Sequence, residues 1–135
     1  ITKNEVKLKQ YEIARNMLDG LYVEYKNIIL CSDTNVMAHE ETEFDQQFEN
    51  NSWMDIWKIK GSNLNKYTYD SENNVYLRIK LSKWKFKSRI DRILCKTDNC
   101  FIEEFNVIHN DDDVEPSDHF GIYGKFAIVK IDDMH

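Results

Sequence analysis

The sequence predicts a single α/β domain, with helices first and strands after. Apolar residues recur at helical spacing near the N-terminus, and period-two alternation dominates the second half. The chain has 135 residues, which is the usual length of one domain. Hydrophobic residues make up 41%, and 7 Phe, 7 Tyr and 3 Trp supply bulk for a packed core, so we exclude wholesale disorder.

The first half predicts a helix, a buried strand and two further helices. Helical spacing of apolar residues, with no Pro or Gly before Gly20, predicts a helix from Glu5 to Tyr25. The continuous apolar run from Ile28 to Cys31 is typical of a strand buried on both faces. A short helix is expected near Glu40–Phe48, and another before Gly61. The recurring residues of the first helix are Val6, Ile13, Met17 and Leu21, and those of the last are Met54, Ile56 and Trp57.

The second half is rich in predicted strands. Strict alternation of apolar and polar residues predicts a half-buried strand over Val75–Leu81. The phase slips afterwards, which indicates a turn or bulge near Ser82. Further strands are expected over Arg89–Lys96, Phe101–His109 and His119–Ile131, with a solvated loop at Asp111–Asp113.

Basic residues gather between Arg78 and Lys96, although the net charge of the chain is -6. Asp91 is the single acid in that stretch, and such a local excess can attract phosphates. A solvated or lysine-protected strand edge has the same composition, and Trp84 and Phe86 fit a core as well as a base-stacking surface. Both interpretations stay open. The basic residues are Arg78, Lys80, Lys83, Lys85, Lys87, Arg89, Arg92 and Lys96.

Cysteine usage and hydropathy indicate an intracellular protein, either nuclear or cytoplasmic. Cys31, Cys95 and Cys100 are odd in number and lack the paired spacing of a metal site, which favours plain thiols in a reducing compartment. No apolar run approaches the length of about 18 residues that a membrane span requires. We therefore expect no membrane span and no disulfide framework.

The first motif with chemical potential is Asp33-Thr34-Asn35, which directly follows the predicted buried strand. Polar residues at the carboxyl end of such a strand often form a site. In an extended segment Asp33 and Asn35 lie on one side, where the Asp can orient or deprotonate water and the Asn can donate to an oxyanion. The alternative is an Asx turn that leads into the next helix.

A second motif, Ser117-Asp118-His119, combines an imidazole with a carboxylate. Here His119 can meet a phosphate and Asp118 can meet a metal ion. An isolated His of this kind is often only a surface residue.

The third motif is Arg89-Ile90-Asp91-Arg92, in which alternation places Arg89 and Asp91 on one face of a strand. An Asp in a strand requires a partner. A His held by Asp91 would have its tautomer fixed and its cationic form stabilised.

Taken in order, these motifs resemble the C-terminal half of the endonuclease/exonuclease/phosphatase superfamily, which carries Gly-Asp-x-Asn, then Arg-x-Asp, then Ser-Asp-His. Within it the chain resembles the magnesium-dependent tyrosyl-DNA phosphodiesterases of the 5′-phosphotyrosyl type, because Thr34 stands where most relatives have an aromatic residue. The resemblance extends from Glu5 to Ile131. Further matching segments are Asp55-Ile56-Trp57, Tyr67-Thr68-Tyr69-Asp70 and Pro116-Ser117-Asp118-His119-Phe120-Gly121.

Several residues depart from the family pattern and leave the substrate open. Ser32 replaces a Gly and Tyr69 replaces a Trp, while Met37-Ala38 stand where a basic and an acidic residue are usual. The family's N-terminal half also supplies an Asn in a Thr-Trp-Asn motif and the Glu that ligates magnesium. This sequence contains neither.

The resemblance implies an α/β fold equivalent to half of a four-layer sandwich, with a mainly antiparallel sheet and flanking helices. Residues 1–135 would be the C-terminal half of a single catalytic domain. An apolar sheet face would then be open unless the N-terminal half or another chain covers it.

The implied activity is that of a metal-dependent phosphodiesterase of the DNA repair type. Its partners would be DNA or RNA ends, including protein-linked ends, and its cofactor Mg²⁺. By resemblance, Asp33 orients or activates water, Asn35 and His119 donate to the phosphoryl oxygens, Asp91 holds His119, Asp118 assists the metal, and Tyr69, Arg89 and Arg92 contact the substrate.

Two other functions stay open. The same fold can serve a related nuclease or a lipid or inositol phosphoesterase. A catalytically inactive binding module is also consistent with the sequence, because the Glu ligand is absent. We expect this chain alone to be inactive.

Overall fold

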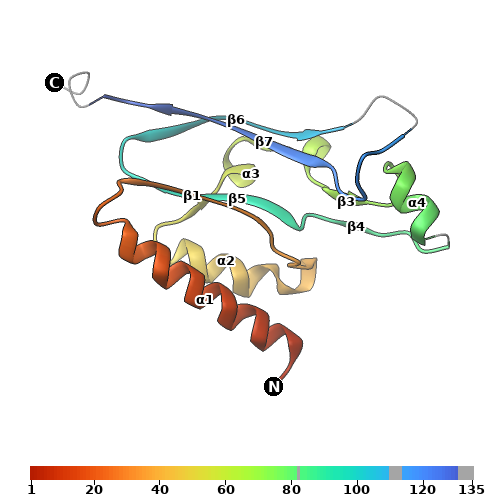
Figure 1. Cartoon of the computed structure of the whole chain (residues 1–135), viewed down its shortest axis with the longest axis horizontal. Coiled ribbons are helices and arrows are strands. Elements are labelled where there is room, and N and C mark those ends of the chain that lie inside the picture. The colour runs from red at the N-terminus through yellow and green to blue at the C-terminus, as the bar shows by residue number, and fades with distance from the viewer. Residues whose placement is uncertain (82, 110–113, 131–135) are drawn as a thin grey trace.

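The computed structural model describes residues 1–81, 83–109 and 114–130. It confirms a mixed α/β fold, drawn in Figure 1. Within the described residues no helix has the length and apolar character needed to cross a membrane. The helices are α1 (Lys3–Leu21), α2 (Glu41–Glu49), α3 (Ile56–Lys60) and α4 (Val75–Leu81), and 3₁₀ turns lie at Ala38–Glu40 and Asn63–Asn65. The strands are β1 (Asn27–Asp33), β2 (Met54–Asp55), β3 (Tyr69–Asp70), β4 (Lys87–Ser88), β5 (Asp91–Thr97), β6 (Cys100–Ile108) and β7 (Gly121–Ile128).

The centre of the fold is a three-stranded sheet with the order β1-β5-β2, in which both pairs are antiparallel. The register aligns Asp33 with Asp91, so that the last residue of β1 faces the first residue of β5. The hairpins β3-β4 and β6-β7 form two further sheets. Helices α1 and α2 lie on one side of the central sheet and the β6-β7 hairpin lies on the other (Figure 1).

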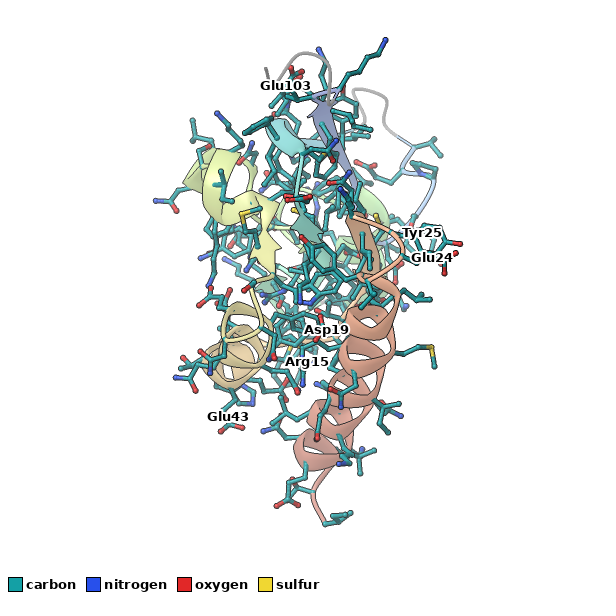
Figure 2. All side chains as sticks on the ribbon, turned by 90° about the vertical axis from the view of Figure 1, so that its left-hand side faces the viewer. Arg15, Asp19, Glu24, Tyr25, Glu43 and Glu103 are labelled. Atoms are coloured by element: carbon teal, nitrogen blue, oxygen red, sulfur yellow. The ribbon has the colours of Figure 1, made fainter. Side chains whose placement is uncertain are left out.

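Two apolar clusters lie on opposite faces of β5, because successive side chains of a strand point to opposite faces. Leu94 belongs to the cluster under α1 and α2, where Phe44, Phe48 and Trp53 pack against one another. Cys95 belongs to the second cluster, which α3, β6 and β7 complete. The side view in Figure 2 shows side chains filling both layers.

Helix α1 forms as predicted, but the apolar stripe that predicts it faces outward. Its N-terminus is a capping box, in which Thr2 and Glu5 bond each other's backbone N–H groups. The side that packs on the core presents partly buried residues instead, namely Leu8, Tyr11, Leu18 and Tyr22. The outward residues Val6, Ile13, Met17 and Leu21 are between 42% and 68% exposed.

The strand prediction for Val75–Leu81 is wrong, because this segment is helix α4. The buried Asn74 side chain accepts a hydrogen bond from the Leu77 backbone N–H at 2.9 Å, and so begins a helical turn. Leu77 is fully buried whereas Ile79 is 76% exposed, so the apolar residues do not share one strand face. The bulge predicted near Ser82 and the loop at Asp111–Asp113 lie outside the described residues.

The prediction that Ile28–Cys31 is buried on both faces is also wrong. Ile28 is buried, but Ile29 is 45% exposed and Cys31 is exposed. β1 is an edge strand, and only its inner side is covered by α1 and α2. Cys95 and Cys100 are buried free thiols, as expected, and Cys31 is not buried.

The basic stretch Arg78–Lys96 does not form one ribbon. Two of its residues lie on α4, one on β4 and two on β5, and the rest lie in connecting segments. Most of the eight form ion pairs with acidic residues in the described part of the chain, among them Lys80 with Asp118 and Lys87 with Glu72. A continuous lysine-lined strand edge is therefore excluded.

Candidate active site

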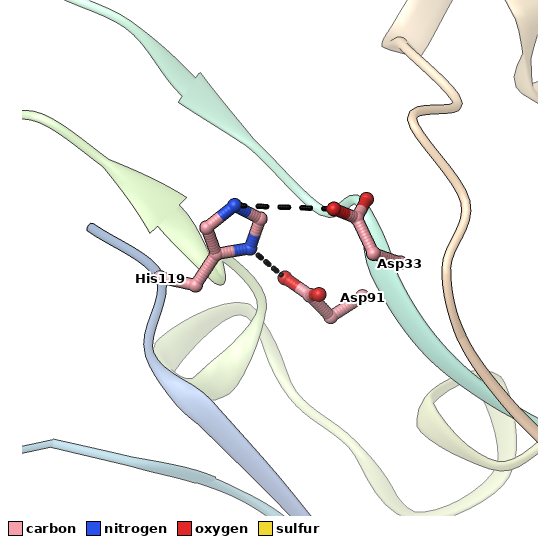
Figure 3. Close-up of side chains that lie close together, drawn as sticks. All are labelled: Asp33, Asp91 and His119. Carbon is pink, nitrogen blue, oxygen red and sulfur yellow. Dashed lines mark hydrogen bonds and ion pairs between the residues drawn. The ribbon is translucent and has the colours of Figure 1, made fainter. Parts of the chain in front are cut away.

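Three ionisable side chains meet where β1 ends, β5 begins and the chain enters β7 (Figure 3). His119 Nδ1 lies 2.8 Å from Asp91 Oδ2, and His119 Nε2 lies 4.0 Å from Asp33 Oδ2. The side chains of Asp33, Asp91 and His119 are 46%, 18% and 26% exposed. The imidazole therefore lies between two carboxylates at the surface.

Two buried threonines fix the backbone around this trio. The Thr34 N–H and hydroxyl both donate to the Ile90 carbonyl, at 2.6 and 2.7 Å. Thr68 accepts from the Asp91 N–H through its hydroxyl at 3.2 Å, and its carbonyl accepts from the Phe120 N–H at 2.7 Å. Both threonines are at most 2% exposed, so the three segments cannot shift independently without breaking buried hydrogen bonds.

Asn35 extends the site from the trio. Its backbone has φ of 51°, in the left-handed region that Asn tolerates better than most residues. Its N–H donates to Asp33 Oδ1 at 3.1 Å, so the Asx turn that the motif offered as an alternative coexists with the site. All four residues predicted as catalytic, Asp33, Asn35, Asp91 and His119, thus lie together.

A pocket of about 470 Å³ opens beside His119. The Tyr69 ring packs edge-on against His119, with centroids 5.1 Å apart, and against Phe86 at 5.6 Å. Trp84 is 78% exposed at the pocket. The lining comprises Asn35, Met37, Tyr69, Leu81, Trp84, Phe86, Ile90, Asp118 and His119.

Asp118 lines this pocket, but its carboxylate forms an ion pair with Lys80 of α4. Its Oδ2 is 3.0 Å from Lys80 Nζ, and that hydrogen bond is the main reason why the pKa of the Asp118 carboxyl is lowered. Asn74 also donates to the Ser117 carbonyl at 3.0 Å, so α4 and the Ser117–His119 loop are held together at two points. Asp118 is therefore not among the carboxylates that meet at His119.

Arg89 and Arg92 do not reach the His119 pocket. Their side chains are 4% and 1% exposed. Arg89 contacts Asp55 and Glu41, both at 2.6 Å, and Arg92 contacts Asp45 at 3.2 Å. The expectation that these arginines contact the substrate is not met at this pocket, because both guanidinium groups bind acids of α2 and β2: Arg89 does so from the segment before β5, and Arg92 from β5 itself.

The sequence analysis offered Trp84 as a possible base-stacking residue but did not predict that Leu81 and Met37 line the same pocket. The signal that Trp84 is exposed was its two charged neighbours, one lysine on each side, which a core aromatic residue rarely has. It also missed Lys80 as the partner of Asp118, since the two are 38 residues apart.

The described residues place two carboxylates and one imidazole within metal-ligand reach. Ligand atoms of Asp33, Asp91 and His119 all lie within 4.8 Å of one another. Mg²⁺ prefers a near-octahedral set of oxygen ligands, and Asp91 already holds the imidazole. This set alone does not fit Mg²⁺, and a further carboxylate is needed.

No protein-family profile and no curated protein matches the sequence. Solved structures do match over most of this chain. TDP2 of D. rerio with single-strand DNA product matches with a TM-score of 0.71 and 20% identity, over 93% of this chain and 51% of that one. Truncated TDP2 of Caenorhabditis elegans has a TM-score of 0.64 and 17% identity, over 90% and 48%.

An endonuclease/exonuclease/phosphatase family protein from Bacteroides thetaiotaomicron matches with a TM-score of 0.60 and 18% identity, over 90% of this chain and 45% of that one. The chain thus spans about half the length of these structures. At these identities the likeness establishes the fold. The chain has the fold of one half of an endonuclease/exonuclease/phosphatase structure, as its motifs implied.

Proposed function

We propose that this chain is the C-terminal half of a metal-dependent phosphodiesterase that hydrolyses phosphodiester or 5′-phosphotyrosyl bonds at nucleic-acid ends, in DNA repair inside the cell. The observation that carries the proposal is the trio at the strand ends, with His119 held by Asp91 at 2.8 Å and facing Asp33. Phosphodiester hydrolysis needs an oriented water and donors to the non-bridging oxygens, and this arrangement offers both.

The hydrogen-bond geometry supports separate roles for the two ring nitrogens of His119. Its Nδ1 faces a carboxylate, so Nδ1 carries a proton and donates to Asp91. Nε2 is then the ring nitrogen that meets a phosphoryl oxygen, and a proton on it would make it a donor. Asn35 supplies a second donor through its side-chain amide. Asp33, the most exposed of the trio, orients or activates the attacking water.

The pocket beside His119 supports a nucleic-acid substrate. Tyr69, Phe86 and Trp84 offer ring faces and edges beside the proposed phosphate position, and bases stack on aromatic side chains without strict sequence preference. The D. rerio TDP2 structure of the same fold carries single-strand DNA. A phosphoinositide or sphingolipid head group is a less suitable ligand for such an aromatic wall.

In this proposal the main magnesium ligand, a Glu, comes from the N-terminal half of the domain, which lies outside this chain. When bound, Mg²⁺ would neutralise charge on the phosphoryl oxygens. Asp33 is the residue here with an accessible carboxylate near the site, whereas Asp118 is engaged by Lys80. Because the donor set is incomplete, we derive no step through the metal and expect little or no hydrolysis by this chain alone.

The test compares this chain with a longer polypeptide that also carries the N-terminal half, using a 5′-phosphotyrosyl oligonucleotide and Mg²⁺. We expect turnover by the longer polypeptide only, and a loss of about 10²–10⁴-fold with His119→Ala. His109→Ala is the matched control and should retain activity. Binding without turnover by the longer polypeptide would instead identify a binding module, and turnover by the 135-residue chain would show that its metal site is complete.

A further inference from the structure

We propose that Lys7 on α1 is a positioning residue for this site, whose ammonium group holds Asn35 in the backbone conformation that aims its side-chain amide at the substrate phosphate. The inference rests on the proposed function for the role of Asn35. Lys7 lies on helix α1, which covers one side of the central sheet and contains none of the motifs singled out for their chemistry.

The contacts of Lys7 reach the site loop directly. Its Nζ lies 2.6 Å from the Asn35 carbonyl oxygen and 2.7 Å from Glu40 Oε2. The same Glu40 oxygen accepts the Met37 backbone N–H at 3.2 Å. The side chains of Lys7 and Glu40 are 22% and 10% exposed. One partly buried ion pair thus ties both ends of the segment from Asn35 to Glu40.

The charge state of Glu40 is consistent with this contact. Burial alone would raise the pKa of its carboxyl, but the hydrogen bonds from Lys7 and from the Met37 backbone outweigh burial and lower it. The Glu40 carboxyl is therefore ionised at neutral pH. A charge-assisted hydrogen bond of this length is stronger than a neutral one.

Asn35 needs such a restraint because its conformation is uncommon. Asn35 and Ser52 are the non-glycine residues with positive φ among those described. A residue in the left-handed region persists when its surroundings hold it there. Asn35 is held on its N–H by Asp33 and on its carbonyl by Lys7.

The two restraints differ in what happens during the reaction. In the proposed mechanism the Asp33 carboxylate engages water or a proton, which weakens its bond to the Asn35 N–H. Lys7 contacts no reacting group and stays bound throughout. Lys7 is thus the restraint that keeps the Asn35 amide in place while Asp33 does chemistry.

The test uses the ¹⁵N-labelled chain and inorganic phosphate as the probe, followed by NMR. Lys7→Gln is compared with Lys9→Gln, a matched control on the same helix whose lysine forms a surface ion pair with Glu12 at 3.1 Å. In Lys7→Gln we expect the backbone chemical shifts and the HN–Hα coupling constant of Asn35 to change away from the values typical of a residue with positive φ. Phosphate binding, read on Asn35 and His119, should weaken about tenfold, as expected for a charge-assisted bond. Lys7→Arg should restore part of both, and Lys9→Gln should match the wild type.

The outcomes separate the inference from the function on which it rests. If phosphate shifts the signals of neither Asn35 nor His119 in the wild type, the proposed function fails. The Asn35 conformation in Lys7→Gln, compared with the wild type, still tests the role of Lys7. If Lys7→Gln melts as the wild type does and keeps the positive-φ signature and the phosphate affinity, the positioning role is refuted. Should Lys7→Gln lose its cooperative fold, Glu40→Gln decides, because it keeps an acceptor for the Met37 N–H and removes only the charge. Unchanged Asn35 signals in Glu40→Gln would then overturn the inference.

Discussion

Removal of the Asp55 carboxylate is expected to destabilise the fold more than any change at the site. Asp55 Oδ2 lies 2.6 Å from Arg89 Nη1 and 3.6 Å from Arg92 Nη1. Its Oδ1 accepts the Trp57 backbone N–H at 3.1 Å, which caps α3. One buried side chain therefore neutralises two arginines and begins a helix.

Two substitutions separate these roles. Asp55→Asn keeps an oxygen for the α3 cap but removes the charge, leaving guanidinium groups at 4% and 1% exposure with fewer acids. Breaking a buried ion pair costs about 3–5 kcal/mol, and we expect the lower end because Glu41 still contacts both arginines. Asp55→Ala also loses the cap and should cost about 1 kcal/mol more.

The free energy of unfolding is measured by urea denaturation followed by circular dichroism. Asp98→Asn is the control, since that carboxylate is 57% exposed and 3.9 Å from Lys26, and should change stability by less than about 0.5 kcal/mol. A loss below about 1 kcal/mol for Asp55→Asn would show that the arginines are satisfied without Asp55. The account of them as structural residues would then fail.

Three further predictions concern packing, pH and thiol chemistry. Gly124→Ala should cost about 1–3 kcal/mol in urea unfolding, because the added Cβ would lie 2.6 Å from Ile56 Cδ1 inside the second cluster. Lys80→Gln should raise the pKa of the Asp118 carboxyl in an NMR titration, because the Lys80 hydrogen bond is the main cause of its lowering. With Lys80 present, that carboxyl contributes stability above its ordinary value of 3.8, and the contribution fades as the pH falls below it. A thiol reagent should modify Cys31 rapidly in the folded chain, and the other two cysteines only on unfolding.

The chain offers a control for each of these three predictions. Gly20→Ala should not destabilise, because a Cβ there meets nothing within 4 Å. Lys83→Gln should leave the Asp118 titration unchanged. Burial raises the pKa of the Cys95 thiol to about 12, so rapid labelling of Cys95 at pH 8 would contradict its placement in the core.

Local patterns predicted strands β1 and β5 because their signals are short-range, but they placed Met54 in a helix, whereas it lies in the short strand β2 of the same sheet. The run Ile28–Cys31 and the later segment around Leu94 were each predicted as strands from their own residues, whereas the antiparallel sheet was implied by the resemblance; the structure pairs the two strands antiparallel. Exposure could not be predicted in the same way. Whether Ile29 is covered depends on what packs on the outer face of β1, and no local pattern encodes that.

The strand prediction for the α4 segment was wrong for a related reason. Alternation over Val75–Leu81 is also compatible with a helix when one residue, Leu77, supplies most of the buried area. The deciding contact is the Asn74 side chain, which caps the helix and bonds Ser117, a residue 43 positions away. Tertiary contacts of this range overrode the period-two signal.

The grouping of Asp33, Asp91 and His119 was predictable because these residues violate local rules. The register pairs Asp33 with Asp91, and like charges directly opposite one another across two strands destabilise a sheet. An Asp is also a poor strand former. His119 lies between the two carboxylates at 2.8 and 4.0 Å, so its ring nitrogens give this strand pair polar partners. The imidazole that we propose for phosphate contact is therefore also the group that faces the two acids, so the local cost in the sheet and the proposed chemistry meet at one side chain.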